Sequence, residues 1–139
     1  MSLVASNLMA ASAAIILGLG MIHLVYTFHG TKLHPRDAAL ISRMQEVSPV
    51  LTRETTTWKT WIGFNASHSL GAILFGLIYG YLSLMQSALL FQSVFLLAVG
   101  LLTLLAYVAL AKRYWFSIPY RGIVAATILY AAAVLNVVI

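Results

Sequence analysis

Four apolar segments, each long enough to cross a lipid bilayer, occupy most of this sequence and restrict what it can fold into. They run over residues 4–28, 61–85, 87–111 and 118–138. About 20 apolar residues at a rise of about 1.5 Å each cover a hydrocarbon core of about 30 Å. The alternation typical of a membrane β-strand is absent, so the segments are predicted to be helices. The predicted fold is an all-α integral membrane four-helix bundle, with residues 1–139 as a single transmembrane domain.

The basic residues are confined to two connecting stretches, and this predicts an orientation in the membrane. The first stretch contains Lys32, Arg36, Arg43, Arg53 and Lys59, and the second contains Lys112, Arg113 and Arg121. The positive-inside rule predicts that both stretches, including the long loop 29–60, lie in the cytoplasm and that both termini lie outside. A bacterial cytoplasmic (inner) membrane is the expected location. The net charge of +5 flanks apolar spans and suits lipid headgroups, so no nucleic-acid partner is expected.

The first loop is predicted to contain a short amphipathic helix on the inner membrane surface, over residues 35–47. Leu40, Ile41, Met44 and Val47 recur at helical spacing, which gives the helix one apolar face. The Pro at position 35 suits a first helical turn, and Ser48-Pro49 is expected to end the helix.

The absence of cysteine, and of acidic residues within the apolar segments, restricts the classes of function open to this chain. The sequence has no cysteine, which excludes a disulfide framework, a thiolate metal site and a cysteine nucleophile. Its three acidic residues, Asp37, Glu46 and Glu54, all lie in the first loop. A proton pump or ion-coupled transporter usually needs an acid within the membrane, so these classes are disfavoured.

Small residues at four-residue spacing predict close approach of helices. Gly76 and Gly80 form a GxxxG motif in the second apolar segment. Such motifs let helix backbones pack tightly in lipid. The motif is interpreted as packing within the bundle, with the seam of a homo-oligomer as the alternative.

The second apolar segment carries the residues most suggestive of chemistry. Its polar and aromatic residues follow one another at steps of three or four, which places them on one helix face. They are Trp58, Trp61, Asn65, His68, Ala72, Phe75 and Tyr79. An amide and an imidazole are costly to bury in hydrocarbon without partners, so Asn65 and His68 are predicted to face the bundle interior. His23 lies at a similar depth in the first segment and is a candidate partner, and the sequence leaves open whether His23 and His68 meet.

Three interpretations of these residues stay open. In the first, His23, Asn65 and His68 hydrogen-bond across helices and only specify packing, as in a non-catalytic accessory or structural subunit of a larger membrane complex. In the second, they form a binding or catalytic site for a lipophilic small molecule near the cytoplasmic face. His68 then acts as general acid or base, since imidazole titrates near neutral pH, and Asn65 orients a carbonyl or hydroxyl group. In the third, His23 and His68 hold a b-type haem.

The second interpretation also assigns ligand-binding residues near the membrane interface. Three tryptophans are expected to wall the apolar part of the ligand, and Lys59 or Arg113 to hold an anionic head group. The full predicted set is His23, Trp58, Lys59, Trp61, Arg113, Trp115 and Tyr120. Preference of aromatic residues for the headgroup belt is the alternative explanation for the tryptophans and Tyr120.

A metal site is not predicted. His29, His34 and Asp37 lie close together in the loop, but their spacing matches no zinc signature. Solvated histidines at the interface are the preferred interpretation, with a divalent metal as the alternative.

Several runs of the sequence resemble a group of small bacterial four-span membrane proteins to which no activity is assigned. These runs are HLVYTF at residues 23–28, LHPRD at 33–37, WKTWIGFNASHSLG at 58–71 and YWFSIP at 114–119. The resemblance implies a four-span fold and no catalytic residue. In size and span number the chain is also similar to the membrane-associated eicosanoid and glutathione metabolism proteins. It lacks their Arg-x-x-Arg-Ala-His-x-Asn-x-x-Glu signature, so only their trimeric habit is kept as an analogy.

Overall fold

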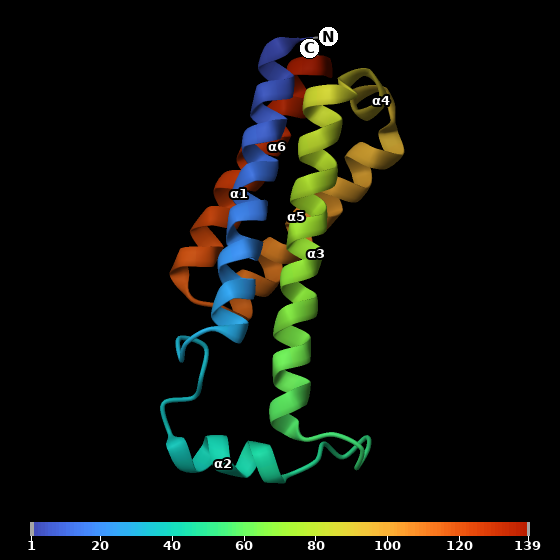
Figure 1. Ribbon diagram of the computed structural model, residues 1–139. Coiled ribbons are helices and arrows are strands. Elements are labelled where there is room, and N and C mark those ends of the chain that lie inside the picture. The colour runs from blue at the N-terminus through green and yellow to red at the C-terminus, as the bar shows by residue number, and fades with distance from the viewer. Residues whose placement is uncertain (1, 139) are drawn as a thin grey trace. The chain divides into compact units, whose positions relative to one another are not determined.

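A computed structural model of the chain describes residues 2–138, and within them the secondary structure is helical, with no strand. Four helices are long and apolar enough to cross a membrane, which confirms the predicted fold class of a membrane-spanning helical bundle. They are α1 (Leu3–Phe28), α3 (Thr57–Met85), α5 (Val94–Tyr114) and α6 (Ser117–Val138). Two short helices, α2 (Ala38–Glu46) and α4 (Ser87–Gln92), lie in the connections (Figure 1).

The third membrane helix begins later than the sequence predicts. Instead of one helix over 87–111, the chain forms α4, breaks at Ser93 and continues as α5 to Tyr114. Ser93 has extended backbone angles, and its hydroxyl accepts a hydrogen bond from the Leu96 N–H at 3.2 Å. This is an N-cap, because it satisfies one of the amides that a helix start leaves without a partner. The polar Ser93 therefore starts α5.

The loop helix is shorter than predicted and begins at a different cap. The structure has α2 over Ala38–Glu46, where the sequence predicts a helix over 35–47. Asp37 is the N-cap, and its carboxylate accepts a hydrogen bond from the Ala39 N–H at 2.9 Å. Pro35 therefore precedes the helix instead of opening it. In Figure 1, α2 lies in the connection between the C-terminal end of α1 and the N-terminal end of α3.

The chain divides into two compact units. The first, called here the core unit, contains Met1–Leu19 and Ala72–Ile139. The second, called the polar unit, contains Gly20–Gly71. The helices α1 and α3 each contribute residues to both units, whereas α4, α5 and α6 belong to the core unit and α2 belongs to the polar unit.

The core unit is built on small residues and interlocking side chains. A Cβ placed on Gly76 would lie 2.6 Å from Leu17 Cβ and 2.8 Å from the Ala13 carbonyl oxygen. The GxxxG motif of α3 therefore packs against α1 within the chain, as the packing interpretation predicts. Between α1 and α6, the Ser12 hydroxyl donates to the Ala126 carbonyl oxygen at 2.7 Å. Such close approach and interhelical hydrogen bonds are what join helices in lipid.

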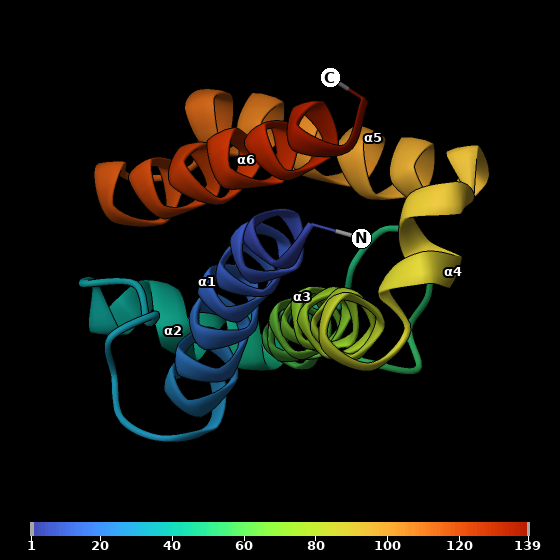
Figure 2. The ribbon, with the colours of Figure 1, turned by 90° about the horizontal axis from the view of Figure 1, so that it is seen from above.

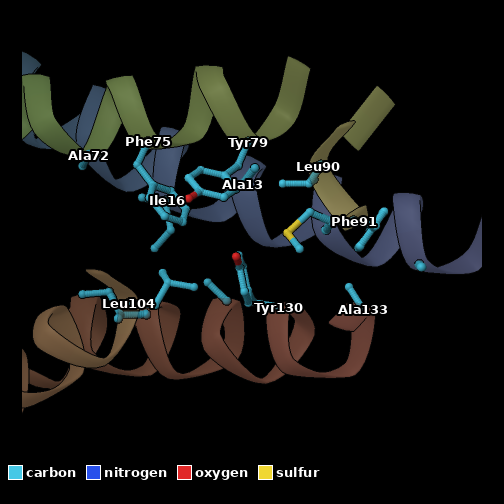
Figure 3. Packing of buried hydrophobic residues seen from close by; sticks show 14 of the residues in the cluster. Ala13, Ile16, Ala72, Phe75, Tyr79, Leu90, Phe91, Leu104, Tyr130 and Ala133 are labelled. Atoms are coloured by element: carbon cyan, nitrogen blue, oxygen red, sulfur yellow. The ribbon is translucent and has the colours of Figure 1, made fainter. Parts of the chain in front are cut away.

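Figure 3 shows the centre of this unit, where side chains of α1, α3, α4, α5 and α6 meet. The buried hydroxyl of Tyr79 donates to the Leu96 carbonyl oxygen at 2.7 Å, and that of Tyr130 donates to the Leu97 carbonyl oxygen at 3.0 Å. Both bonds reach the first turn of α5, beside Gly100, where a Cβ would overlap the two tyrosine side chains. The helices α5 and α6 run alongside each other (Figure 2). Just before α1 begins, the Ser2 hydroxyl donates to Oδ1 of Asn136, near the C-terminal end of α6, at 2.7 Å.

Candidate functional site

The polar face of α3 is continuous, because α3 runs without a break through Trp58, Trp61, Asn65 and His68. Spacings of three, four and three residues keep these side chains on one face of a helix. The Asn65 side-chain amide nitrogen donates to the Trp61 carbonyl oxygen at 2.8 Å. The Ser69 hydroxyl donates to the Asn65 carbonyl oxygen at the same distance, 2.8 Å. The sequence-predicted face is therefore present, and Asn65 is fixed on it by the helix backbone.

His23 of α1 meets Asn65 of α3. Its Nε2 atom lies 2.9 Å from Asn65 Oδ1. A backbone carbonyl oxygen can only accept, so the bond to Trp61 orients Asn65 with its nitrogen toward that carbonyl and its oxygen toward His23. An amide oxygen also only accepts, and His23 must therefore carry its proton on Nε2 and donate it. In the neutral ring, Nδ1 is then the acceptor nitrogen.

His68 adjoins the same pair. Its ring centroid lies 5.4 Å from that of His23, and the two ring planes are 81° apart, an edge-to-face contact. His23, Asn65 and His68 thus form one group, called here the histidine–asparagine cluster. Each of the three residues is half-buried. The sequence leaves open whether His23 and His68 meet, and the structure brings both rings to Asn65 within the polar unit.

A second group of rings extends the same face of α3 toward its N-terminal end. Trp58 and Trp61 stack with their centroids 5.3 Å apart and their planes 15° apart. His34 contacts them edge-to-face, with centroid distances of 4.9 Å to Trp58 and 6.5 Å to Trp61. These three residues are called here the aromatic cluster. It is joined to the histidine–asparagine cluster through Trp61, whose carbonyl oxygen binds the Asn65 amide.

His34 is the residue of this site that sequence reasoning missed. The sequence places it in a loop after Gly30, where it was interpreted as a solvated histidine or a metal ligand with His29 and Asp37. A loop position has no periodicity that would predict its neighbour. The sequence offers only an indirect indication of this contact, because two tryptophans on one helix face imply that another side chain covers them. Within residues 2–138, no group of three or more His, Asp or Glu side chains is arranged to hold a metal ion.

The remaining predicted site residues are divided between the two units. Lys59 is exposed, next to Trp58 on α3. Arg113, Trp115 and Tyr120 belong to the core unit, where Trp115 lies 6.4 Å from Tyr107 between ring centroids. Their participation in one site with the histidine–asparagine cluster stays a prediction. Within the polar unit, the structure brings together His23, Asn65, His68, Trp58 and Trp61 and adds His34.

The arrangement of the two imidazoles bears on the haem alternative. In a bis-histidine haem, the two imidazoles bind iron on opposite faces of the porphyrin. Here the rings of His23 and His68 contact each other directly, and the His23 Nε2 atom is engaged by Asn65. A haem would require the rings to separate and that hydrogen bond to break. The geometry therefore does not fit this cofactor.

Hydrogen bonding and proton exchange are the chemistry that this geometry supplies. Imidazole can both give and take a proton, and a carboxamide can donate to one group while it accepts from another. The two stacked indoles provide a flat apolar surface beside these groups.

No family model matches the sequence, and no curated protein or solved structure matches it significantly. Interpretation of the site therefore rests on its own geometry.

Proposed function

We propose that this multi-pass membrane protein binds a lipophilic small molecule that carries a carbonyl or hydroxyl oxygen. The site is the histidine–asparagine cluster, with the aromatic cluster beside it. The single observation that carries the proposal is the meeting of His23 and His68 with Asn65, two imidazoles and one amide from two helices of membrane-spanning length. Polar groups at such positions are costly to bury, and in membrane helices they mark functional sites by default.

Asn65 has more hydrogen-bonding groups than its bonds to Trp61 and His23 use. Asn65 has two amide hydrogens and an oxygen with two lone pairs. One hydrogen goes to Trp61 and one lone pair receives His23 Nε2–H. A second hydrogen and a second lone pair are left to a ligand oxygen. Because Asn65 is only half-buried, such an oxygen can approach it from the lipid or from the membrane interface.

Each residue has a role in this proposal. Asn65 orients the ligand oxygen, and His68 gives it a proton or takes one from it, while His23 holds the Asn65 amide in place. Trp58 and Trp61 lie against the apolar part of the ligand.

The membrane placement of this site belongs to the same proposal. The polar unit contains the basic loop between α1 and α3, and the positive-inside rule assigns that loop to the cytoplasm. The cluster then lies near the cytoplasmic face of a bacterial inner membrane, with both termini outside.

The test is mass spectrometry of the molecules that stay bound after gentle detergent extraction of the full chain. Wild-type protein is expected to retain an oxygen-bearing lipophilic compound near one equivalent, and Asn65→Leu and His68→Leu to lose it. Ser67→Ala is the matched control, because Ser67 is exposed on the same helix and bonds only to the Phe64 carbonyl oxygen of its own helix.

Three results would contradict the proposal. One is an identical set of bound molecules in wild type and in both variants that retain their helical circular-dichroism signal. Another is co-purification of a larger partner protein at fixed ratio with no small molecule, because it would favour the accessory-subunit interpretation instead. A lipophilic compound lost equally from Ser67→Ala would also count against the site.

A further inference from the structure

The connection between α5 and α6 combines positive charge with exposed apolar side chains. Three basic residues, Lys112, Arg113 and Arg121, lie within ten positions and are all exposed. Between them, Tyr114 is 68% exposed, Phe116 is 64% exposed and Ile118 is 71% exposed. Residues 112–121 are called here the basic turn. Its surface is therefore cationic and apolar at once.

The core unit, to which this turn belongs, contains no Asp or Glu to balance the positive charge of the turn. All three acidic residues of the chain, Asp37, Glu46 and Glu54, belong to Gly20–Gly71. The core unit therefore has three cations at the basic turn and no Asp or Glu. The ion pair recorded within residues 2–138 joins Arg43 to Glu46 at 3.2 Å, in α2 of the polar unit. The core unit therefore supplies no carboxylate side chain to the basic turn, and its positive charge suits an anion from outside the protein.

The turn is held rigidly enough to present these charges. Trp115 donates its backbone N–H to the Ala111 carbonyl oxygen at 3.1 Å, which ends α5. The side chains of Trp115 and Tyr120 are half-buried and pack against the hydrophobic core of the unit. The Arg113 guanidinium lies 5.7 Å from the centroid of the Tyr114 ring. Two aromatic anchors thus fix the backbone, and the basic side chains extend from it.

We propose that the basic turn is a binding site for the headgroup of an anionic phospholipid. Phosphate oxygens match the guanidinium and ammonium groups in charge and hydrogen bonding. The exposed apolar side chains of Tyr114, Phe116 and Ile118 can contact lipid acyl chains. A soluble phosphate has no acyl chain and could not make these contacts. This combination of cations and interfacial aromatic residues is what the polar–apolar boundary of a leaflet favours. The lipid therefore has a role separate from that of the ligand at the histidine–asparagine cluster.

The test uses Trp115 as a reporter of neighbouring lipid. The chain has three tryptophans, so Trp58→Phe with Trp61→Phe leaves Trp115 as the only one. The full-length variant is placed in phosphatidylcholine vesicles that contain a small fraction of brominated phosphatidylglycerol or of brominated phosphatidylcholine. Brominated chains quench indole fluorescence at contact, so the ratio of the two quenching efficiencies reports the headgroup preference at Trp115.

We expect phosphatidylglycerol to be preferred by about fivefold or more, and replacement of all three basic residues by Gln to abolish the preference. The matched control removes the same charge from the other loop, by Lys32→Gln, Arg36→Gln and Arg53→Gln, and should keep it. Native mass spectrometry of the chain with all its tryptophans repeats the comparison by counting retained lipids, in case the reporter variant does not fold.

Three outcomes would overturn the proposal. The first is equal quenching by the two brominated lipids. The second is equal loss of preference in both triple variants, since this would mean that only net charge matters. The third is removal of the preference by millimolar glycerol phosphate in solution, because the site would then select free phosphate and not a lipid.

Discussion

The two compact units are held together by different interactions. Among residues 2–137, the buried hydrophobic side chains all lie in the core unit, as in Figure 3. In the polar unit the buried side chains are those of Thr27 and Ser69, and its longest-range contacts join half-buried polar and aromatic groups. Close packing stabilises the first unit, whereas hydrogen bonds and ring contacts between half-buried polar and aromatic groups characterise the second. Variants of the two units should therefore separate stability from binding.

The largest loss of stability is expected from Gly76→Ala in the core unit. The new Cβ would overlap Leu17 and the Ala13 carbonyl oxygen of α1, and backbone cannot move aside as a side chain can. We expect the free energy of unfolding to fall by about 2–3 kcal/mol. Titration with sodium dodecyl sulfate in mixed micelles, followed by circular dichroism, measures it. Gly80→Ala is the control in the same motif, because its Cβ would meet Ala13 Cβ at an ordinary 3.8 Å. Equal losses in the two variants would contradict the packing described for α1 and α3.

A smaller loss is expected from Tyr130→Phe. The substitution removes the hydroxyl that binds the Leu97 carbonyl oxygen but keeps the buried ring. Interhelical hydrogen bonds in membranes contribute about 0.6 kcal/mol on average and about 1.7 kcal/mol at most. The same unfolding titration should show a loss in this range, with ligand retention unchanged. Loss of the bound molecule from this variant would mean that the two units are not separable in function.

The polar unit should respond in the opposite way. A double-mutant cycle of His23→Leu and Asn65→Leu should give a coupling energy of only about 0.6 kcal/mol in unfolding. Either single variant should nevertheless lose the bound molecule, because Asn65→Leu removes the group that orients the ligand oxygen and His23→Leu removes the group that holds the Asn65 amide in place. A coupling energy of several kcal/mol, with ligand retention unaffected, would identify the cluster as a packing element.

The smallest effect is expected from Gly63→Ala in the polar unit. No atom lies within 4 Å of the Cβ that the substitution adds. The free energy of unfolding should change by less than about 0.5 kcal/mol, as at surface positions away from special features. A loss as large as that of Gly76→Ala would show that helix glycines matter here for a reason other than close approach.

The sequence predicts the helices well because hydropathy and helical spacing are local properties. The four spans and the polar face of α3 follow from spacing along the helices, and the similar depth of His23 and His68 follows from their positions in the spans. The hydrogen bond between His23 and Asn65 depends on how α1 and α3 are rotated, which the sequence does not give. The break at Ser93 is harder to predict, because it depends on one hydroxyl that caps a helix inside an otherwise apolar run. The contact of His34 with Trp58 depends on the path of a loop, which has no periodic signal.

The division into two units is the feature that sequence reasoning could not supply. Arg113, Trp115 and Tyr120 share an interfacial composition with Trp58 and Lys59, and the prediction that they form one site rests on that composition. The structure assigns Arg113 and its neighbours to the unit formed with α6, and Lys59 to the unit formed with α2. That assignment depends on which helix faces pack together, and tertiary packing is not encoded in any single segment.

The central claim is that His23, Asn65 and His68 form a site for an oxygen-bearing lipophilic molecule. The most direct measurement is the nitrogen NMR spectrum of protein labelled at histidine and reconstituted in bilayers, with a long-chain methyl ketone or the alkane of equal length. We expect the ketone to shift the ring resonances of His23 and His68 and the alkane to leave them unchanged. The resonances of the exposed His29 should stay unchanged with either compound. Resonances of His23 and His68 that ignore the ketone, or that move no more than those of His29, would contradict the claim.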